Sequence, residues 1–103
     1  MAKLSLIADP TFTVKVRIPV AGGEPSDVEM TFKHRTKSAL ELFIKSRAGR
    51  SDVESFLEMV SGWEFEEELN PASVELLLQN YMGTALATYR TYVDELVQAK
   101  LKN

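Results

Sequence analysis

Apolar and polar residues alternate along two segments in the first third of the chain. In TVKVRIPV at 13–20 and VEMTFK at 28–33, every second residue is apolar, which is typical of strands with one buried face. The AGGEPSD stretch between them predicts a loop, and Pro19 marks a strand end or an edge position. We therefore expect a β-hairpin over about residues 12–33. Because two strands alone are marginally stable, the hairpin needs a helix on its apolar face or a third strand, for which residues 3–7 are the candidate.

Helical spacing of apolar residues follows the hairpin. Thr36 is a suitable N-cap for a helix over about 37–47, whose apolar residues fall on one side. The sequence SDVE at 51–54 is a capping box, in which the serine hydroxyl accepts a backbone N–H and the glutamate reaches back. It predicts a second helix over about 52–61 that stops at Gly62.

The longest apolar pattern begins at Asn70, which can cap a helix that has Pro71 in its first position. An unbroken helix over about 71–100 would be roughly 45 Å long, whereas a chain of this size has a radius of gyration of about 13 Å. Either the helix breaks near Gly83, with Thr84 capping a second helix, or its end projects. A projecting end would expose an apolar patch of the kind that meets another chain, and its candidate residues are Tyr89, Tyr92, Val93, Leu96 and Val97.

These elements predict an α+β fold in a single domain, residues 1–103, with an N-terminal β-hairpin followed by three to four helices, the last long and amphipathic. The net charge of −3 is unevenly placed. Residues 1–50 contain nine Lys/Arg and five Asp/Glu, and residues 51–103 contain three and ten, which gives +4 and −7. This asymmetry can steer head-to-tail self-association or attract a charged partner, or both faces can simply be solvated.

Several kinds of chemistry find no support in the sequence. The absence of cysteine excludes disulfides, thiolate metal ligands and a cysteine nucleophile, and it fits a reducing cytosol. The apolar run near the start is too short for a signal peptide, and no stretch approaches the length of a membrane span. We expect a soluble cytoplasmic protein with no membrane partner.

Motifs that could suggest an active site are incomplete. His34 stands alone beside basic residues, and the glycine pair at 22–23 lacks the Gly-Lys-Ser/Thr ending of a phosphate-binding loop. The glutamates at 64–68 lack the alternating ligands of a calcium loop, so they are an acidic lead-in to the next helix or a patch for a basic partner. The acidic chain shows no nucleic-acid-binding motif. We expect no enzymatic activity, no catalytic, cofactor-binding or metal-binding residue, and no nucleic-acid partner.

Aromatic residues are the remaining candidates for function. Trp63, the only tryptophan, either anchors the loop to the core or anchors an interface, because tryptophan and tyrosine are enriched at interaction hot spots. Tyr81 is expected in the core. Tyr89 and Tyr92 are better interface candidates, because they lie on the part of the helix that could project.

The segment from Gly62-Trp63 through NPASVELLLQNYMGTALATYRTYVDEL resembles the tail assembly chaperones of long, flexible-tailed, lambda-like bacteriophages. The resemblance lies in a Gly-Trp element, a helix with a tyrosine near its middle, and a closing helix with spaced tyrosines. The segments IPVAGGEP and FKHRTKSALELFIKSRAG also look like members of this group, so the resemblance covers nearly the whole chain. Met82-Gly83 departs from the small or prolyl residue that usually follows the mid-helix tyrosine.

The resemblance implies a non-enzymatic protein of the host cell cytoplasm that is absent from the mature virion. It implies binding to the tape measure protein, which is kept competent while tail tube subunits polymerise around it, and we expect a homo-oligomer that associates through the final helix. The alternative is a structural phage or prophage component, such as a minor tail or connector protein.

The resemblance also implies a frameshifted pair of products, of which the extended form recruits the tail tube protein. Leu101, Lys102 and Asn103 can be encoded by codons that contain a slippery heptamer, so they are the candidate frameshift site.

Overall fold

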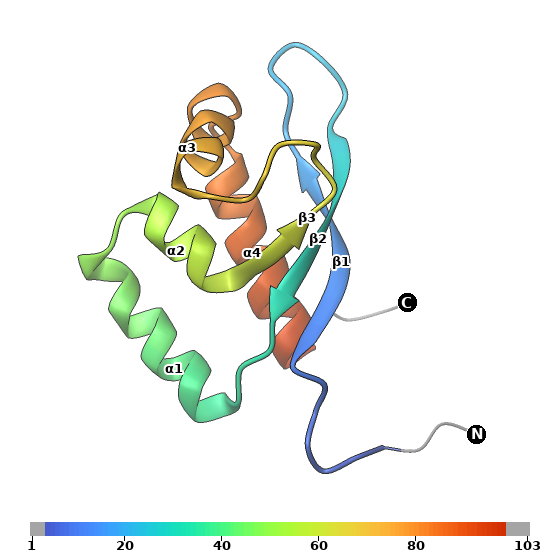
Figure 1. The fold of residues 1–103 in the computed structure, drawn as a ribbon, viewed down its shortest axis with the longest axis vertical. Coiled ribbons are helices and arrows are strands. Elements are labelled where there is room, and N and C mark those ends of the chain that lie inside the picture. The colour runs from blue at the N-terminus through green and yellow to red at the C-terminus, as the bar shows by residue number, and fades with distance from the viewer. Residues whose placement is uncertain (1–3, 99–103) are drawn as a thin grey trace.

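Three antiparallel strands form a sheet in the order β1-β2-β3 (Figure 1). The structure, a computed structural model, describes residues 4–98. Strands β1 (Thr11–Ile18) and β2 (Ser26–Lys33) form the hairpin expected from the sequence. Strand β3 (Val60–Trp63) extends the sheet by pairing with β2.

The alternation of the hairpin places its apolar side chains on one face of the sheet. Val16, Met30 and Phe32 are fully buried, whereas Lys15 and Arg17 are exposed on the opposite face. Antiparallel sheets commonly have one packed face and one solvated face. The alternation of apolar and polar residues in the hairpin therefore fits a sheet that is covered by helices on one face only. The hairpin packs against α4 and α2, which lie beside the sheet in Figure 1.

Within residues 4–98, four α-helices and a short 3-10 turn accompany the sheet, and the helix-start signals predicted from the sequence are confirmed. The Thr36 hydroxyl accepts a hydrogen bond from the backbone N–H of Ala39 at 3.2 Å. Both hydrogen bonds of a capping box are formed at Ser51 and also at Asn70, where Ser73 is the second partner. These caps satisfy backbone donors that a helix leaves unpaired. The helices are α1 (Lys37–Ser46), which continues into the 3-10 turn η1 (Arg47–Gly49), α2 (Asp52–Met59), α3 (Pro71–Asn80) and α4 (Thr84–Val97).

The third strand corrects two expectations. Residues 4–7 form no strand, and β3 takes the edge of the sheet instead. Helix α2 ends at Met59 rather than near Gly62, because Val60 adopts an extended backbone and pairs with Phe32 of β2. Gly62 is therefore part of β3 and not a helix cap.

The long C-terminal pattern is two helices, so of the two alternatives the structure shows the break near Gly83 and not a projecting end. The break falls at residues 81–83, and Gly83 rather than Thr84 is the N-cap of α4. An added Cβ at Gly83 would lie 2.9 Å from the Cγ atom of Pro19, so the hairpin loop approaches the connection closely. After the break α4 runs along the sheet (Figure 1). One of its tyrosines, Tyr92, is part of the core.

The predicted fold class, α+β with an N-terminal hairpin and three to four helices, is confirmed, with four α-helices in the described residues. The candidate frameshift residues 101–103 lie outside the described part of the chain.

Candidate partner-binding surfaces

Trp63 organises the connection between β3 and α3. Its ring contacts Phe56 and Phe65 edge-on, with centroids 6.0 Å and 5.0 Å away. Its indole N–H donates to the carbonyl of Glu67 at 2.8 Å, so the connection folds around the ring. Trp63 is only half-buried, and it also lines a surface groove.

This groove lies between the connection and two turns of α3, and we call it the α3 groove. Its volume is about 290 Å³, and its floor and walls combine aromatic and aliphatic side chains from both segments. Leu76 is 61% exposed and Tyr81 is 41% exposed at its rim, so apolar surface here faces solvent. The lining residues are Trp63, Phe65, Glu67, Ser73, Leu76, Leu77, Asn80 and Tyr81.

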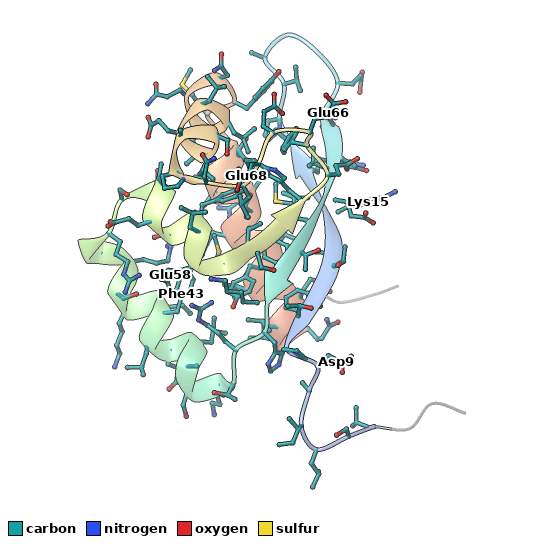
Figure 2. All side chains as sticks on the ribbon, viewed as in Figure 1. Asp9, Lys15, Phe43, Glu58, Glu66 and Glu68 are labelled. Carbon is teal, nitrogen blue, oxygen red and sulfur yellow. The ribbon has the colours of Figure 1, made fainter. Side chains whose placement is uncertain are left out.

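The α3 groove has an acidic rim. Between residues 51 and 89 the sequence contains no lysine, arginine or histidine. Figure 2 labels Glu66 and Glu68 on the connection that leads from β3 to α3. Glu66, Glu67 and Glu68 are exposed on this connection, and Glu67 lines the groove. Glu64 is exposed as well and accepts a hydrogen bond from the backbone N–H of Glu29.

Helix α3 is held beside this connection by its cap. Ser73 donates its hydroxyl proton to the carbonyls of Glu68 and Asn70, at 2.6 Å and 3.1 Å, and accepts the N–H of Asn70. Val74 and Leu77 are buried on the inner side of the helix. Because the cap and the buried side fix the helix, the outer side chains that line the groove are held in place as well.

A second apolar region lies at the end of α4. Leu6 and Ile7 of the segment before β1 are 103% and 81% exposed, and Val97 of α4 is 51% exposed. They line a hollow of about 570 Å³ together with Ala8, His34, Arg35, Thr36, Lys37 and Leu96. We call this region the α4-end surface. Its polar side is basic, in contrast to the α3 groove.

Tyr92 lies in the core, which corrects the expectation that it belongs to an exposed patch. It is 0% exposed and stacks against Phe12 and Phe32, with an edge contact to Phe43. Its hydroxyl donates to the carbonyl of Lys33 at 2.7 Å and accepts from Arg35 at 2.9 Å. Burial raises the pKa of the Tyr92 phenol, against the opposing effect of the hydrogen bond from Arg35.

The other candidates on α4 have different environments. Tyr89 is half-buried beneath the guanidinium of Arg47, which lies 3.5 Å from the ring centroid. Val93 and Leu96 are partly buried, and Val97 is exposed. The structure therefore places Trp63 in the α3 groove, Tyr92 in the core, and Leu96 and Val97 on the α4-end surface. Tyr89 packs against the core from a partly buried position, and Val93 lines neither surface.

The exposed apolar residues around the α3–α4 connection were missed by the sequence analysis. Tyr81 was expected in the core, but α3 ends at Asn80 and leaves Tyr81 on the surface. Three consecutive leucines at 76–78 were a usable signal, because adjacent helical residues point in different directions and cannot all face the core. The exposed set is Leu76, Tyr81, Met82 and Leu86.

Arg35, one of the basic residues beside His34, has a structural role. Its guanidinium donates to the carboxylate and the carbonyl of Glu58, at 3.0 Å and 2.8 Å, and lies 4.6 Å from the centroid of Phe43. Arg50 adds a second ion pair to Glu58 at 3.2 Å. These contacts join the turn after β2 to α1 and α2, so Arg35 stabilises the fold.

Within residues 4–98, no group of three or more acidic or histidine side chains is arranged to hold a metal ion. None of the helices described for this part of the chain has both the length and the apolar character needed to cross a membrane.

The exposed apolar surfaces are candidates for partner binding, and comparison with known families identifies the class of protein. A family model described as phage tail assembly chaperone matches residues 1–103. The chain therefore belongs to the phage tail assembly chaperone family, which is non-enzymatic. No curated protein matches the chain, and no solved structure matches it.

Proposed function

We propose that this protein binds the tape measure protein of a phage tail and keeps it soluble and competent while tail tube subunits polymerise around it. Family membership supports the proposal. The structural observation that carries it is the exposed apolar set around the α3–α4 connection, in which Met82 is 89% exposed and Leu76 is 61% exposed. Clustered apolar surface of this kind is typical of interaction sites.

The mechanism follows from burial of apolar surface. A long helical client exposes apolar side chains until the tube encloses it, and each bound chaperone would remove part of that surface from water. Every Å² of apolar area buried contributes about 25 cal/mol, so even a small contact opposes aggregation. Many copies along one client add avidity without tight individual binding, which allows later displacement by the tube.

Co-expression tests this function. The tape measure protein is expressed with and without this chain, and its soluble fraction is measured before affinity purification and sizing. We expect more soluble client and co-elution of the two proteins. Equal solubility in both cultures, with no co-elution, would contradict the proposal.

Self-association is the second part of the proposal. The α4-end surface supports it, because Val97 and the segment containing Leu6 and Ile7 expose apolar side chains beside each other. Val97→Asp should lower the oligomer mass in light scattering, and an unchanged mass would assign self-association to another surface. Tyr92 is unsuitable for such a test, because a charge at this buried position would unfold the domain.

An extended product made by frameshifting would recruit the tail tube protein. Leu101, Lys102 and Asn103 support this step only through the codons that can encode them. Sequencing these codons provides the test. A missing slippery heptamer, or a closed −1 frame downstream, would remove this site from the proposal.

Location separates the chaperone from a structural tail component. The proposal places the protein in the host cytoplasm and outside the finished particle. Mass spectrometry should therefore detect it in infected cells and not in purified virions, and stoichiometric recovery from virions would favour a minor tail or connector protein.

A further inference from the structure

The α3 groove combines an apolar floor with an acidic rim, and this combination specifies a partner more closely than apolar exposure alone. We infer that the α3 groove binds a cationic amphipathic helix of the client, with the partner's apolar side chains against Trp63, Leu76 and Tyr81. The inference rests on the proposed function for the identity of the client. It assigns client binding to the α3 groove, and it specifies that the bound segment of the client is positively charged and has apolar residues at helical spacing.

The length of the groove favours a helix. Its α3 wall runs from Ser73 to Tyr81, which corresponds to about 12 Å at 1.5 Å per residue. This length matches about two turns of a partner helix, whose anchors would recur at three-to-four-residue spacing. The wall consists of side chains rather than the free edge of a strand, so it offers no backbone ladder to an extended peptide.

Charge determines which helix fits. Glu67 lines the groove, Glu66 and Glu68 are exposed next to it on the same connection, and the surrounding segment 51–89 contains no basic side chain. A helix with lysine or arginine beside its apolar face would find opposite charge on the rim, whereas an acidic helix would be repelled. A second copy of this chain also carries a basic half, residues 1–50, so the experiment below includes an outcome that separates this occupant from the client.

Trp63 provides a direct readout, because it is the only tryptophan and its ring lines the groove. The probe is a synthetic 18-residue helical peptide without tryptophan, with leucines at helical spacing and lysines on the remaining face. Its matched control keeps the leucines and replaces every lysine with glutamate. Trp63 emission is followed during titration of the full chain at low and at moderate salt.

We expect the lysine peptide to shift Trp63 emission saturably, and to bind at least about tenfold more tightly than the glutamate peptide at low salt. Leu76→Ser should weaken binding at least about fivefold, because it removes an exposed anchor from the groove. Leu42→Ser is the control, because Leu42 is 69% exposed on α1 and does not line the groove.

Three results would overturn the inference. They are equal binding of the two peptides, an unchanged Trp63 emission, and an emission shift with protein concentration alone that Leu76→Ser abolishes. The last result would assign the groove to a second copy. If the client co-elutes with this protein but the lysine peptide does not bind, the groove is rejected as the binding site and the proposed function stands. If the lysine peptide binds but the client does not co-elute, the proposed function is rejected and the groove stands as a binding site for cationic helices.

Discussion

At the scale of single residues, Tyr92 combines packing with hydrogen bonding at the centre of the molecule. Its ring fills the space between the sheet and α1, and its hydroxyl joins the turn after β2 through Lys33 and Arg35. A buried polar group is stabilising only when its partners are present. Tyr92 therefore links the last helix to the hairpin by both kinds of contact.

Replacement of Tyr92 by phenylalanine tests this link. The ring stays, but the carbonyl of Lys33 and the guanidinium of Arg35 lose a partner. We expect the free energy of unfolding to fall by about 1–3 kcal/mol in urea denaturation. Tyr81→Phe is the control, because Tyr81 is 41% exposed, and it should change stability by less than about 0.5 kcal/mol. Equal effects would show that the Tyr92 hydroxyl contributes nothing specific.

The difference in stability between the wild type and Tyr92→Phe should also depend on pH. Burial raises the pKa of Tyr92 above its usual 10.0, so the folded state keeps the phenol proton at a pH where the unfolded chain has lost it. The stability contributed by this group is complete below pH 10 and decreases as pH rises towards the folded pKa. Unfolding curves at high pH should show the wild-type advantage over Tyr92→Phe narrowing. A constant difference would contradict the raised pKa.

Thr88 is a position at which we expect a substitution to stabilise the protein. It is fully buried on α4, and its hydroxyl has no hydrogen-bond partner among the described residues. Thr88→Val keeps the shape and removes the unpaired group, so we expect a gain of about 1 kcal/mol in thermal or urea unfolding. Thr91→Val, at a partly exposed position of the same helix, should be nearly neutral. A loss of stability at Thr88 would show that its hydroxyl has a partner.

At the scale of elements, the break between α3 and α4 determines which side chains are buried. After the break α4 runs along the sheet, and Tyr92 enters the core while Tyr81 and Met82 remain on the surface. The backbone φ of Gly83 is −81°, which any residue can adopt, so its conformation does not require glycine. Its missing side chain leaves room for the ring of Pro19. The requirement for glycine is therefore steric.

Gly83→Ala tests this close approach. The new Cβ would lie 2.9 Å from the Pro19 ring, so the hairpin loop or the connection must shift, at a cost of about 1–3 kcal/mol. Gly49→Ala is the matched control, because no atom lies within 4 Å of its added Cβ. Chemical denaturation of both variants should show a loss only at Gly83. Similar stabilities would mean that the loop yields without cost.

Local signals explain how much of this fold could be predicted. The hairpin and the caps at Thr36, Ser51 and Asn70 depend on nearby residues, and the sequence identified them. Strand β3 depends on pairing with β2, including a register shift near Thr31, and such long-range pairing leaves little trace in a short segment. The environment of Tyr92 could not be predicted either, because a continuous helix and a broken one give the same apolar spacing.

The candidate surfaces follow the same division. Trp63 was predicted to be either a loop anchor or an interface residue. The structure shows its contacts with the loop, and its ring also lines the α3 groove, so an interface role stays a prediction. The groove itself was not predictable, since it requires α3 and the acidic connection to lie side by side. The uneven charge was visible in the sequence, but its position around apolar surface was not.

At the scale of the whole molecule, two apolar surfaces of different charge lie on one small domain. The α3 groove has an acidic rim, and the α4-end surface includes the basic residues Arg35, before α1, and Lys37, at the start of α1. This arrangement would allow one surface to bind client while the other contacts a neighbouring copy. A client could then be covered by many weakly bound chaperones that the tail tube displaces in turn.

The most direct test of client binding compares two double variants during co-expression with the tape measure protein. Leu76→Ser/Tyr81→Ser removes exposed apolar side chains from the α3 groove, and Leu42→Ser/Ile44→Ser removes a matched pair from α1. All four positions are at least partly exposed, so both variants should fold. The measurement is the soluble fraction of the client. We predict that the groove variant loses most of the solubilising effect while the α1 variant keeps it, and equal activity of both variants would contradict client binding through this surface.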